Sequence, residues 1–343
     1  MSWYHIPGND QDVAVSTRVR LARNLTGIPF PARLDAAGAR EVIRTVGAVL
    51  TKNGFVATDF ADISGTAAKA LVEKRWISPA FAKASHPHAL FLNEPCNLAV
   101  MVCAEDHVTI QCILPGLAVG DGLEGAMKVE RLLDSHLELA FGEAWGYLTA
   151  SPADLGSGLR CSVLLSLPML AASGRLEGMR HGLCRGGLWL RGPLGEEDSP
   201  FGHLYQLSNR VTLGVTEEET AATVKEAAEG LILSERRIRD SVTGEELTLL
   251  TDRIRRAEGI LRYGHLLTVP EMTQMLGLMR TGAAMGIVKN VRVEAITALL
   301  SEAMPACLIA GMETPPKGET EKNIFRAQLV RRSLFGEDSS GGF

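Results

Sequence analysis

The sequence lacks a long apolar run and has no recognisable leader segment. Its longest apolar stretch, 161–172, is interrupted by Ser162, Ser166 and Pro168 and is shorter than the roughly 18 residues that cross a bilayer. A basic segment followed by an apolar one, as in a secretory signal, is missing at the N-terminus. We therefore expect a cytoplasmic protein that does not enter the membrane.

Cysteines are few and scattered. Six occur in 343 residues, without a Cys-x-x-Cys pair and without a histidine pair at zinc-site spacing. His86 and His88 have no recognisable third ligand, so a polar loop is the better interpretation of that pair. The expectation is free, buried thiols and no metal held by the chain itself.

Neither sign of charge dominates, since 40 acidic and 35 basic side chains leave a formal net charge of −5. General nucleic-acid binding depends on a basic surface that displaces counterions, so a nucleic-acid partner is not expected. With 46% hydrophobic and 22% charged residues, the composition is that of a soluble globular protein, and the length suggests about two domains.

Alternating apolar and polar residues predict a sheet in the first two thirds of the chain. Strands are expected over 13–21, 98–114, 159–167 and 205–213, and a helix with apolar residues at three- and four-residue steps over 123–141. In the first strand, alternation places Arg18 and Arg20 on the face of Ser16, and Val15 on the opposite face with Val19 and Leu21.

The C-terminal third has a helical pattern that begins with a capping signal at Thr216. Helices are expected over 216–240, 243–263, 270–285 and 291–304, with a last basic helix after the linker 315–318. The fold class is therefore α+β. We predict one domain over 12–240, an all-helical domain over 241–336 and a disordered tail over 337–343.

Lone arginines in apolar strands are the first candidates for chemistry. Arg18 and Arg20 project side by side, and guanidinium pairs match phosphate oxygens, although a solvated strand face is an open alternative. Arg160 follows a Gly/Ser turn, and Arg191 precedes a loop, 192–202, of the composition that often closes over substrates. The spacings of a P-loop and of a dinucleotide-binding fingerprint are absent.

The order of these segments resembles the phosphagen (guanidino) kinases across nearly the whole chain. Each segment alone is weak evidence for the family, but their combination is specific to it. The segments are Ser16–Asn24, Glu105–His107, Gly146–Thr149, Leu155–Arg160, Arg191–Glu196 and Gln206–Gly214. Members that act on small guanidines have a helical domain ahead of the nucleotide motif, whereas here the motif begins at residue 16 and a helical part follows. That order is similar to the bacterial protein-arginine kinases.

The resemblance implies a phosphagen-kinase-type catalytic domain, an antiparallel sheet flanked by helices, that binds ATP with Mg²⁺. Glu105 and Glu196 would orient the acceptor guanidinium and accept its proton. The implied ATP-binding residues are Ser16, Thr17, Arg18, Val19, Arg20, Arg75, Arg160, Cys161, Ser162, Val163, Leu164, Arg191, Gly192, Pro193, Leu194, Gly195 and Glu196. Ser151 is implied in the substrate pocket, where the family commonly has cysteine.

The chain departs from the family at several of these positions. Thr109 stands where a fifth phosphate-binding arginine is usual, and Asp154 stands in place of an asparagine. A phosphoarginine-binding motif of the protein-arginine kinases matches only in its second half; the corresponding residues here are Lys322, Asn323, Arg326 and Ala327.

The implied function is phosphorylation of arginine side chains in proteins, which marks them for Clp-type proteolysis in stress response and protein quality control. The implied partners are protein substrates with exposed arginines, a zinc-binding activator protein, a Clp-type unfoldase and a second copy of the chain in a homodimer. Two alternatives stay open: a catalytically inactive nucleotide-binding or adaptor protein, and a kinase for small guanidines.

Overall fold

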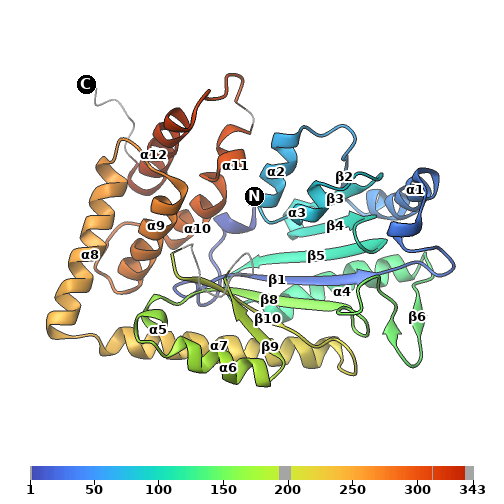
Figure 1. Cartoon of the computed structure of the whole chain (residues 1–343), viewed down its shortest axis with the longest axis horizontal. Coiled ribbons are helices and arrows are strands. Elements are labelled where there is room, and N and C mark those ends of the chain that lie inside the picture. Colours follow the sequence, from blue (N-terminus) through green and yellow to red (C-terminus); the bar gives the residue numbers. More distant parts are fainter. Residues whose placement is uncertain (1, 193–201, 311, 337–343) are drawn as a thin grey trace.

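The computed structural model describes residues 2–192, 202–310 and 312–336, and its centre is an eight-stranded antiparallel sheet (Figure 1). In sheet order the strands are β2 (Val56–Asp59), β3 (Ala89–Asn93), β4 (Leu98–Val102), β5 (Val108–Pro115), β1 (Ala14–Arg23), β8 (Leu159–Ser166), β10 (Leu204–Asn209) and β9 (Leu188–Arg191). A small hairpin, β6 (Phe141–Gly142) and β7 (Gly146–Tyr147), lies beside it. The predicted α+β class is confirmed.

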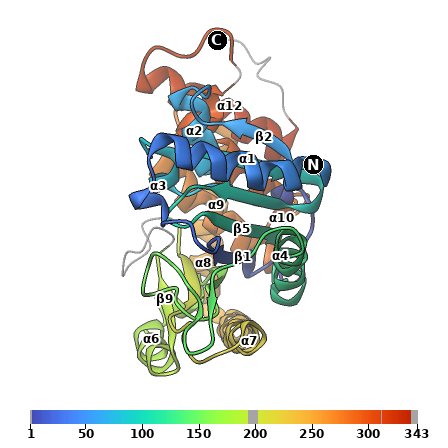
Figure 2. The ribbon, with the colours of Figure 1, turned by 90° about the vertical axis from the view of Figure 1, so that its right-hand side faces the viewer.

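One face of the sheet is covered by three helices, α1 (Ala36–Lys52), α4 (Val119–Asp134) and α7 (Glu217–Ser241) (Figure 2). The side of α4 that contacts β1 and β5 carries Leu123, Ala126, Val129 and Leu133. Gly125 allows a close approach, because a Cβ there would lie 3.1 Å from the Cys112 sulfur. Helix α7 begins with the predicted capping box, formed by Thr216 and Glu219.

Short helices cover the opposite face at one end of the sheet. Helices α2 (Gly65–Glu73) and α3 (Pro79–Ala82) flank Trp76, and Trp76 and Phe81 pack against Leu90 and Met101 of the sheet. At the other end, α5 (Pro168–Ala172) and α6 (Leu176–Arg185) follow β8, and α6 packs against β9.

The C-terminal third is helical and has its own apolar core (Figure 1). Its helices are α8 (Gly244–Tyr263), α9 (Val269–Ala284), α10 (Val293–Glu302), α11 (Pro305–Ile309) and α12 (Glu319–Phe335). Buried residues such as Ile254, Leu276, Leu299 and Val330 form the core of this part, which we call the helical part. Near the N-terminus of the chain a single turn, η1 (Trp3–His5), packs against α10.

The helix predicted over 123–141 is shorter at its C-terminal end than its apolar spacing suggested. Helix α4 ends at Asp134, and the chain continues irregularly to the hairpin that begins at Phe141. Leu137 and Leu139 still pack against the core. Apolar residues therefore continue beyond the helix, and spacing alone does not reveal its end.

The strand predicted over 205–213 is β10, which ends at Asn209. The Asn209 side chain accepts a hydrogen bond from the Cys161 amide and donates one to the Leu159 carbonyl, both at 2.8 Å. It thus takes over the pairing with β8 at the point where the backbone turns away.

The predicted face of Val15 is wrong. The register of β1 against β8 shifts between Ala14 and Ser16, and an extra residue at such a point reverses the alternation. Val15 consequently lies on the same face as Arg18 and Arg20, and packs with Leu164 apart from the core under α4.

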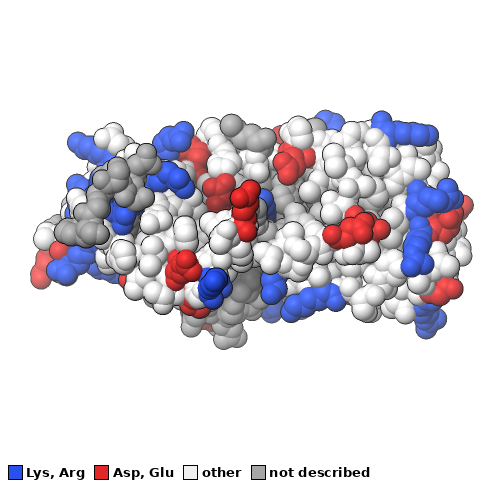
Figure 3. Space-filling view, turned by 90° about the horizontal axis from the view of Figure 1, so that it is seen from above, with Lys and Arg blue, Asp and Glu red and all other residues white. Residues whose placement is uncertain are grey.

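Charged side chains of both signs are spread over the face of the molecule seen in Figure 3, with uncharged areas between them. None of the helices in the described ranges combines the length and hydropathy needed to cross a bilayer. The predicted domain boundary lies at the end of α7, and the predicted tail, 337–343, lies outside the described residues.

Candidate active site

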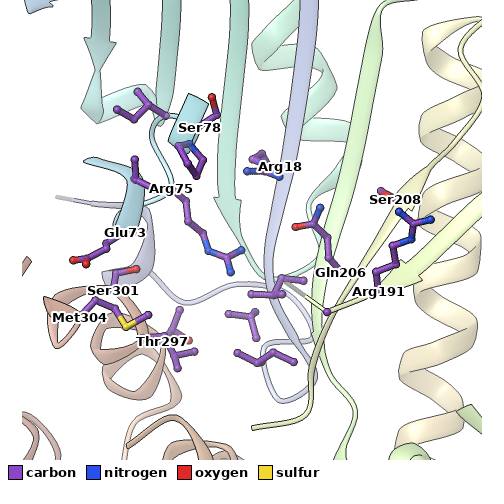
Figure 4. A pocket seen from close by; sticks show the side chains of 18 of the residues that line it. Arg18, Glu73, Arg75, Ser78, Arg191, Gln206, Ser208, Thr297, Ser301 and Met304 are labelled. Atoms are coloured by element: carbon purple, nitrogen blue, oxygen red, sulfur yellow. The ribbon is translucent and has the colours of Figure 1, made fainter. Parts of the chain in front are cut away.

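A cavity of about 540 Å³, which we call the arginine cavity, lies between the sheet and the helical part (Figure 4). Its basic lining residues are Arg18, Arg20, Arg75 and Arg191. Glu73 is the one carboxylate among the lining residues that the structure describes, and it is occupied elsewhere. Its two oxygens accept the amides of Ala306 and Cys307 at 3.0 and 2.7 Å, at the start of α11.

The guanidinium groups of Arg18, Arg20 and Arg75 have no hydrogen-bond or ion-pair partner within the ranges that the structure describes. Burial, together with the charges of Arg20 and Arg75, lowers the pKa of Arg18 to about 9. Burial likewise lowers the pKa of Arg75 to about 10. Neighbouring half-buried cations of this kind favour an anion with several charges.

Arg75 is held by its backbone. It has a left-handed conformation, with φ of 64°, directly after α2. The Gln111 side chain of β5 donates hydrogen bonds to the Arg75 and Trp76 carbonyls at 2.9 and 3.2 Å. These bonds fix the turn and direct the Arg75 side chain into the cavity (Figure 4).

Arg191 extends the same cavity from the edge strand β9. Its guanidinium carbon lies 4.0 Å from the centre of the Trp189 ring, a stacking contact that suits a planar cation. Gly192 also lines the cavity. Glu196 and residues 193–195, which the sequence also implied in ATP binding, lie outside the described residues.

A second cavity, of about 470 Å³, has three carboxylates in its lining, and we call it the carboxylate cavity. Glu105, Asp106 and Asp154 line it, together with three cations, Arg20, Lys83 and Arg160. Because Arg20 lines both cavities, it stands where they meet. The two cavities therefore place a cationic site next to a site that carries carboxylates, with Arg20 and Ser78 lining both.

Glu105 and its acidic neighbour have different roles. Burial and the charges of Asp106 and Asp154 raise the pKa of Glu105. Asp106 accepts hydrogen bonds from the Asn24 side chain and the Ala150 amide, both at 2.7 Å, so it ties the residue after β1 to the loop after β7. Glu105 has no such structural bond among the described residues and is the one suited to contact a ligand.

Arg160 faces the carboxylate cavity and not the arginine cavity. Its Nε donates to Asp154 at 2.5 Å, and its terminal nitrogens donate to the carbonyls of Ala153 and Asn209 at 2.9 and 3.3 Å. In the sheet register Arg160 lies directly beside Arg20. It is thus next to the junction of the two cavities, and Asp154 holds it.

The other residues implied in ATP binding are divided by the pleat of the sheet. Leu164 lines the arginine cavity, whereas Val19, Cys161 and Val163 belong to the core under α4. The Thr17 hydroxyl donates to the Gly116 carbonyl at 2.7 Å and thereby fixes the entry to α4. Ser16 and Ser162 are buried in the strands and are not among the residues that line either cavity.

Two further positions of the family motifs lie away from both cavities. Ser151 accepts the Thr149 hydroxyl through its carbonyl at 2.8 Å and is not among the lining residues of either cavity. His107 is structural, because its ring bonds to the Leu25 amide and the Pro29 carbonyl.

The residues implied in phosphoarginine binding lie on α12. Arg326 is buried, and its guanidinium donates to the carbonyls of Ala303 and Leu267 at 2.8 and 2.9 Å and to the Asn323 side chain. Lys322 pairs with Glu319 on the surface. Arg326 thus connects α12 to α10 inside the helical part.

Sequence reasoning missed the wall that α10 contributes to the arginine cavity, which consists of Thr297, Leu300 and Ser301; Met304, just after this helix, also lines the cavity. The only available signal was the pair of hydroxyl residues, Thr297 and Ser301, four positions apart in the apolar stretch between Glu294 and Glu302. As for a metal, the described residues contain no cluster of three His, Cys, Asp or Glu side chains that could hold one.

Comparison with models of protein families shows to which family the chain belongs. A model described as "ATP:guanido phosphotransferase, C-terminal catalytic domain" matches residues 40–238, and one described as "Protein-arginine kinase McsB C-terminal domain" matches residues 248–341. The chain therefore belongs to the ATP:guanido phosphotransferase family. Its similar relatives are named protein-arginine kinases, and the resemblance inferred from the sequence is confirmed.

These relatives match over nearly their whole length. The protein of Halothermothrix orenii is 36% identical over 337 residues, 97% of this chain and 96% of that protein. The protein of Brevibacillus brevis is 34% identical over 97% of this chain and 95% of its own. That of Clostridium kluyveri is 35% identical over 94% of each.

Solved structures share the fold. The substrate-free duplicated taurocyamine kinase of Schistosoma mansoni matches with a TM-score of 0.58 and 23% identity, over 73% of this chain and 39% of that one. Lombricine kinase matches with a TM-score of 0.58 and 20% identity, over 69% of this chain and 70% of that one. The predicted phosphagen-kinase-type fold is confirmed.

Proposed function

We propose that this protein transfers the terminal phosphoryl group of ATP to arginine side chains of proteins. The observation that carries the proposal is the place of Arg20, which lines both the arginine cavity and the carboxylate cavity. A polyphosphate in the first cavity and a guanidinium in the second would meet at this residue. The protein-arginine kinase names of the relatives support the same activity.

The arginine cavity suits the phosphates of ATP. Arg18, Arg20 and Arg75 supply cationic forks, and Glu73, the one described carboxylate among the lining residues, is bonded elsewhere; the three arginines would stabilise the charge that spreads over the transferring group. Mg²⁺, when bound, neutralises phosphate charge, and it would be carried by the phosphates because Glu73 is committed to α11.

The carboxylate cavity suits the acceptor. A guanidinium has no free lone pair, so a nitrogen can attack phosphorus only as its proton leaves. In the proposed step the N–P bond forms, the bond from phosphorus to the ADP oxygen breaks, and the proton passes to the Glu105 carboxylate. The raised pKa of Glu105 suits it to accept that proton. Glu196 stays a predicted second carboxylate.

The proposal is tested by incubating the protein with labelled ATP, Mg²⁺ and unfolded casein, and by mapping phosphoarginine under conditions that preserve N–P bonds. We expect phosphoarginine with the wild type, none with Glu105→Gln, and wild-type yield with Glu143→Gln, an exposed glutamate of the β6–β7 turn. Calorimetry should show that Glu105→Gln still binds ATP.

Two outcomes would favour the alternatives. ATP binding without phosphoarginine, with an activator protein supplied, would indicate a catalytically inactive nucleotide-binding protein. Faster phosphorylation of free arginine than of casein would indicate a kinase for small guanidines.

The biological setting is proposed from the family resemblance alone. We propose a cytoplasmic enzyme whose substrates, proteins with exposed arginines, are marked for Clp-type proteolysis. A zinc-binding activator protein, a Clp-type unfoldase and a homodimer are the partners that this role predicts.

A further inference from the structure

Arg160 is among the lining residues of the carboxylate cavity and not of the arginine cavity, and an ion pair holds it there. Its Nε donates to the Asp154 carboxylate at 2.5 Å, and both side chains are largely buried, with 22% and 13% of their surface exposed. Its two terminal nitrogens donate to the Ala153 and Asn209 carbonyls at 2.9 and 3.3 Å. All three nitrogens of this guanidinium therefore have a protein partner.

The ion pair lies beside a second arginine. Arg20 and Arg160 stand directly opposite each other in the register of β1 and β8, and like charges at such positions repel. Burial lowers the pKa of Arg20; among the neighbouring charges, that of Asp154 raises this pKa and that of Arg160 lowers it. Asp154 thus compensates, at Arg20, for the charge of Arg160.

The same ion pair decides which charges an incoming guanidinium meets in the carboxylate cavity. Lys83 lines this cavity but is exposed, so water and salt screen its charge. Asp106 is committed to its structural hydrogen bonds. Because Asp154 neutralises Arg160, the unpaired Glu105 carboxylate can attract a cation without a free guanidinium opposing it.

We propose that Asp154 is a positioning residue that keeps Arg160 on the acceptor side of the site and withholds it from the nucleotide phosphates. The phosphates are left to the arginines of the arginine cavity, and the carboxylate cavity stays attractive to a guanidinium. The family resemblance implied Arg160 in ATP binding, so this residue receives a different role. The inference rests on the proposed function and adds how the site divides its arginines between two substrates of opposite charge.

The test variant is Asp154→Asn, which keeps the shape of the side chain and removes its charge. Isothermal titration calorimetry with Mg²⁺ and ADP, and with inorganic tripolyphosphate, measures binding of phosphates. NMR titration with Nα-acetylarginine amide measures binding of the acceptor guanidinium. The matched control is Asp252→Asn on α8, which removes the carboxylate charge from an exposed ion pair, Asp252 with Arg256 at 2.7 Å.

We expect Asp154→Asn to bind ADP and tripolyphosphate about three- to tenfold more tightly, because the charge of Arg160 becomes available to phosphates. The same variant should bind Nα-acetylarginine amide at least about threefold more weakly. The double variant Asp154→Asn/Arg160→Met removes the whole ion pair at constant net charge, and its ADP affinity should stay within about threefold of wild type. Asp252→Asn should leave all three affinities unchanged.

A merely structural role of Asp154 would weaken the binding of both kinds of ligand together. The proposal is wrong if Asp154→Asn weakens ADP binding or leaves it unchanged. It is also wrong if the double variant binds ADP more than about threefold more weakly than wild type, since Arg160 would then be a phosphate ligand.

These equilibrium measurements separate the inference from the proposed kinase activity. The expected pattern in a protein that forms no phosphoarginine would support the role of Asp154 and refute the activity. A wild-type protein that binds neither ADP nor tripolyphosphate would refute both.

Discussion

Three arginines of β1 differ in their hydrogen-bond and ion-pair partners, and therefore in their roles. Arg23 is fully buried, with Glu130 at 2.5 Å, Glu217 at 3.1 Å and the Tyr147 ring centre at 3.5 Å. Arg18 and Arg20, on the same strand, face the arginine cavity without such partners. The first is a structural cation, and the other two are available to a ligand.

Replacing these arginines with methionine should separate the two roles. Arg23→Met would leave Glu130 buried without its cation and should cost about 3–5 kcal/mol of unfolding free energy. Arg18→Met should cost little or add stability, since it removes an uncompensated charge, and should weaken ATP binding at least tenfold. Urea denaturation measures the unfolding free energy, and calorimetry measures ATP binding. Similar destabilisation by Arg23→Met and Arg18→Met would contradict the assignment of Arg23 as structural and Arg18 as ligand-binding.

The acid limb of the pH–rate profile should report Glu105. Its carboxylate must be unprotonated to accept a proton, so kcat should fall as the pH decreases through its raised pKa. Asp154→Asn removes a negative charge that raises this pKa, and the acid limb should shift to lower pH. Asp62→Asn, an exposed control, should leave the limb in place. A shift to higher pH with Asp154→Asn would disprove the role of Glu105.

At the scale of elements, the sequence predicted regular segments better than their surroundings. Strand β1 was predictable because one of its faces meets the core and the other does not. The face of the sheet on which Val15 lies was not predictable, because a register shift depends on the neighbouring strand. The position of Leu300 in the cavity wall could not be predicted either. The apolar spacing of α10 is the same as that of a helix that faces only a core, and the contacts of Leu300 are with residues distant in sequence.

Two elements are joined by a buried carboxylate. Glu235 of α7 accepts the amides of Met169 and Leu170 at 2.9 and 2.8 Å, at the start of α5. Burial raises the pKa of Glu235 to about 7. The folded protein therefore favours the protonated form more than the unfolded chain does.

This carboxylate should make stability depend on pH. Because the folded pKa lies above the ordinary value of about 4.5, unfolding free energy should fall as pH rises from that value to about 7, by at most about 1.4 kcal/mol per pH unit. Urea denaturation at pH 5 and pH 8 should show a smaller difference for Glu235→Gln than for the wild type. The exposed Glu229→Gln should behave as the wild type, and an unchanged difference in Glu235→Gln would rule out this residue as the cause.

At the scale of the whole molecule, the segment before β1 joins the two parts. Asp12 accepts hydrogen bonds from Arg236 at 2.5 and 3.0 Å and from Arg239 at 2.9 Å, all on the last turns of α7. The Gln11 carbonyl accepts one from Arg280 of α9 at 2.6 Å, and the Gln11 side chain donates to Glu294 of α10 at 2.9 Å.

Loss of Asp12 should weaken this connection. Asp12→Ala should lower unfolding free energy by about 1–3 kcal/mol, because several charge-assisted hydrogen bonds disappear together. Asp240→Ala, a neighbouring aspartate that is 76% exposed and 3.9 Å from Arg239, should change it by no more than about 0.5 kcal/mol. Equal effects in thermal or urea unfolding would show that the contacts of Asp12 are dispensable.

These contacts bear on how the molecule divides into exchangeable modules. The segment before β1 precedes the sheet in sequence, yet the side-chain nitrogen and the carbonyl of Gln11 bond to helices of the helical part. In a chimera that takes only residues 242–336 from a relative, α9 and α10 would come from the relative. The segment before β1 would still carry the residues that fit the original helices. We expect such exchanges to give a folded protein only when residues 2–12 are transplanted together with the helices.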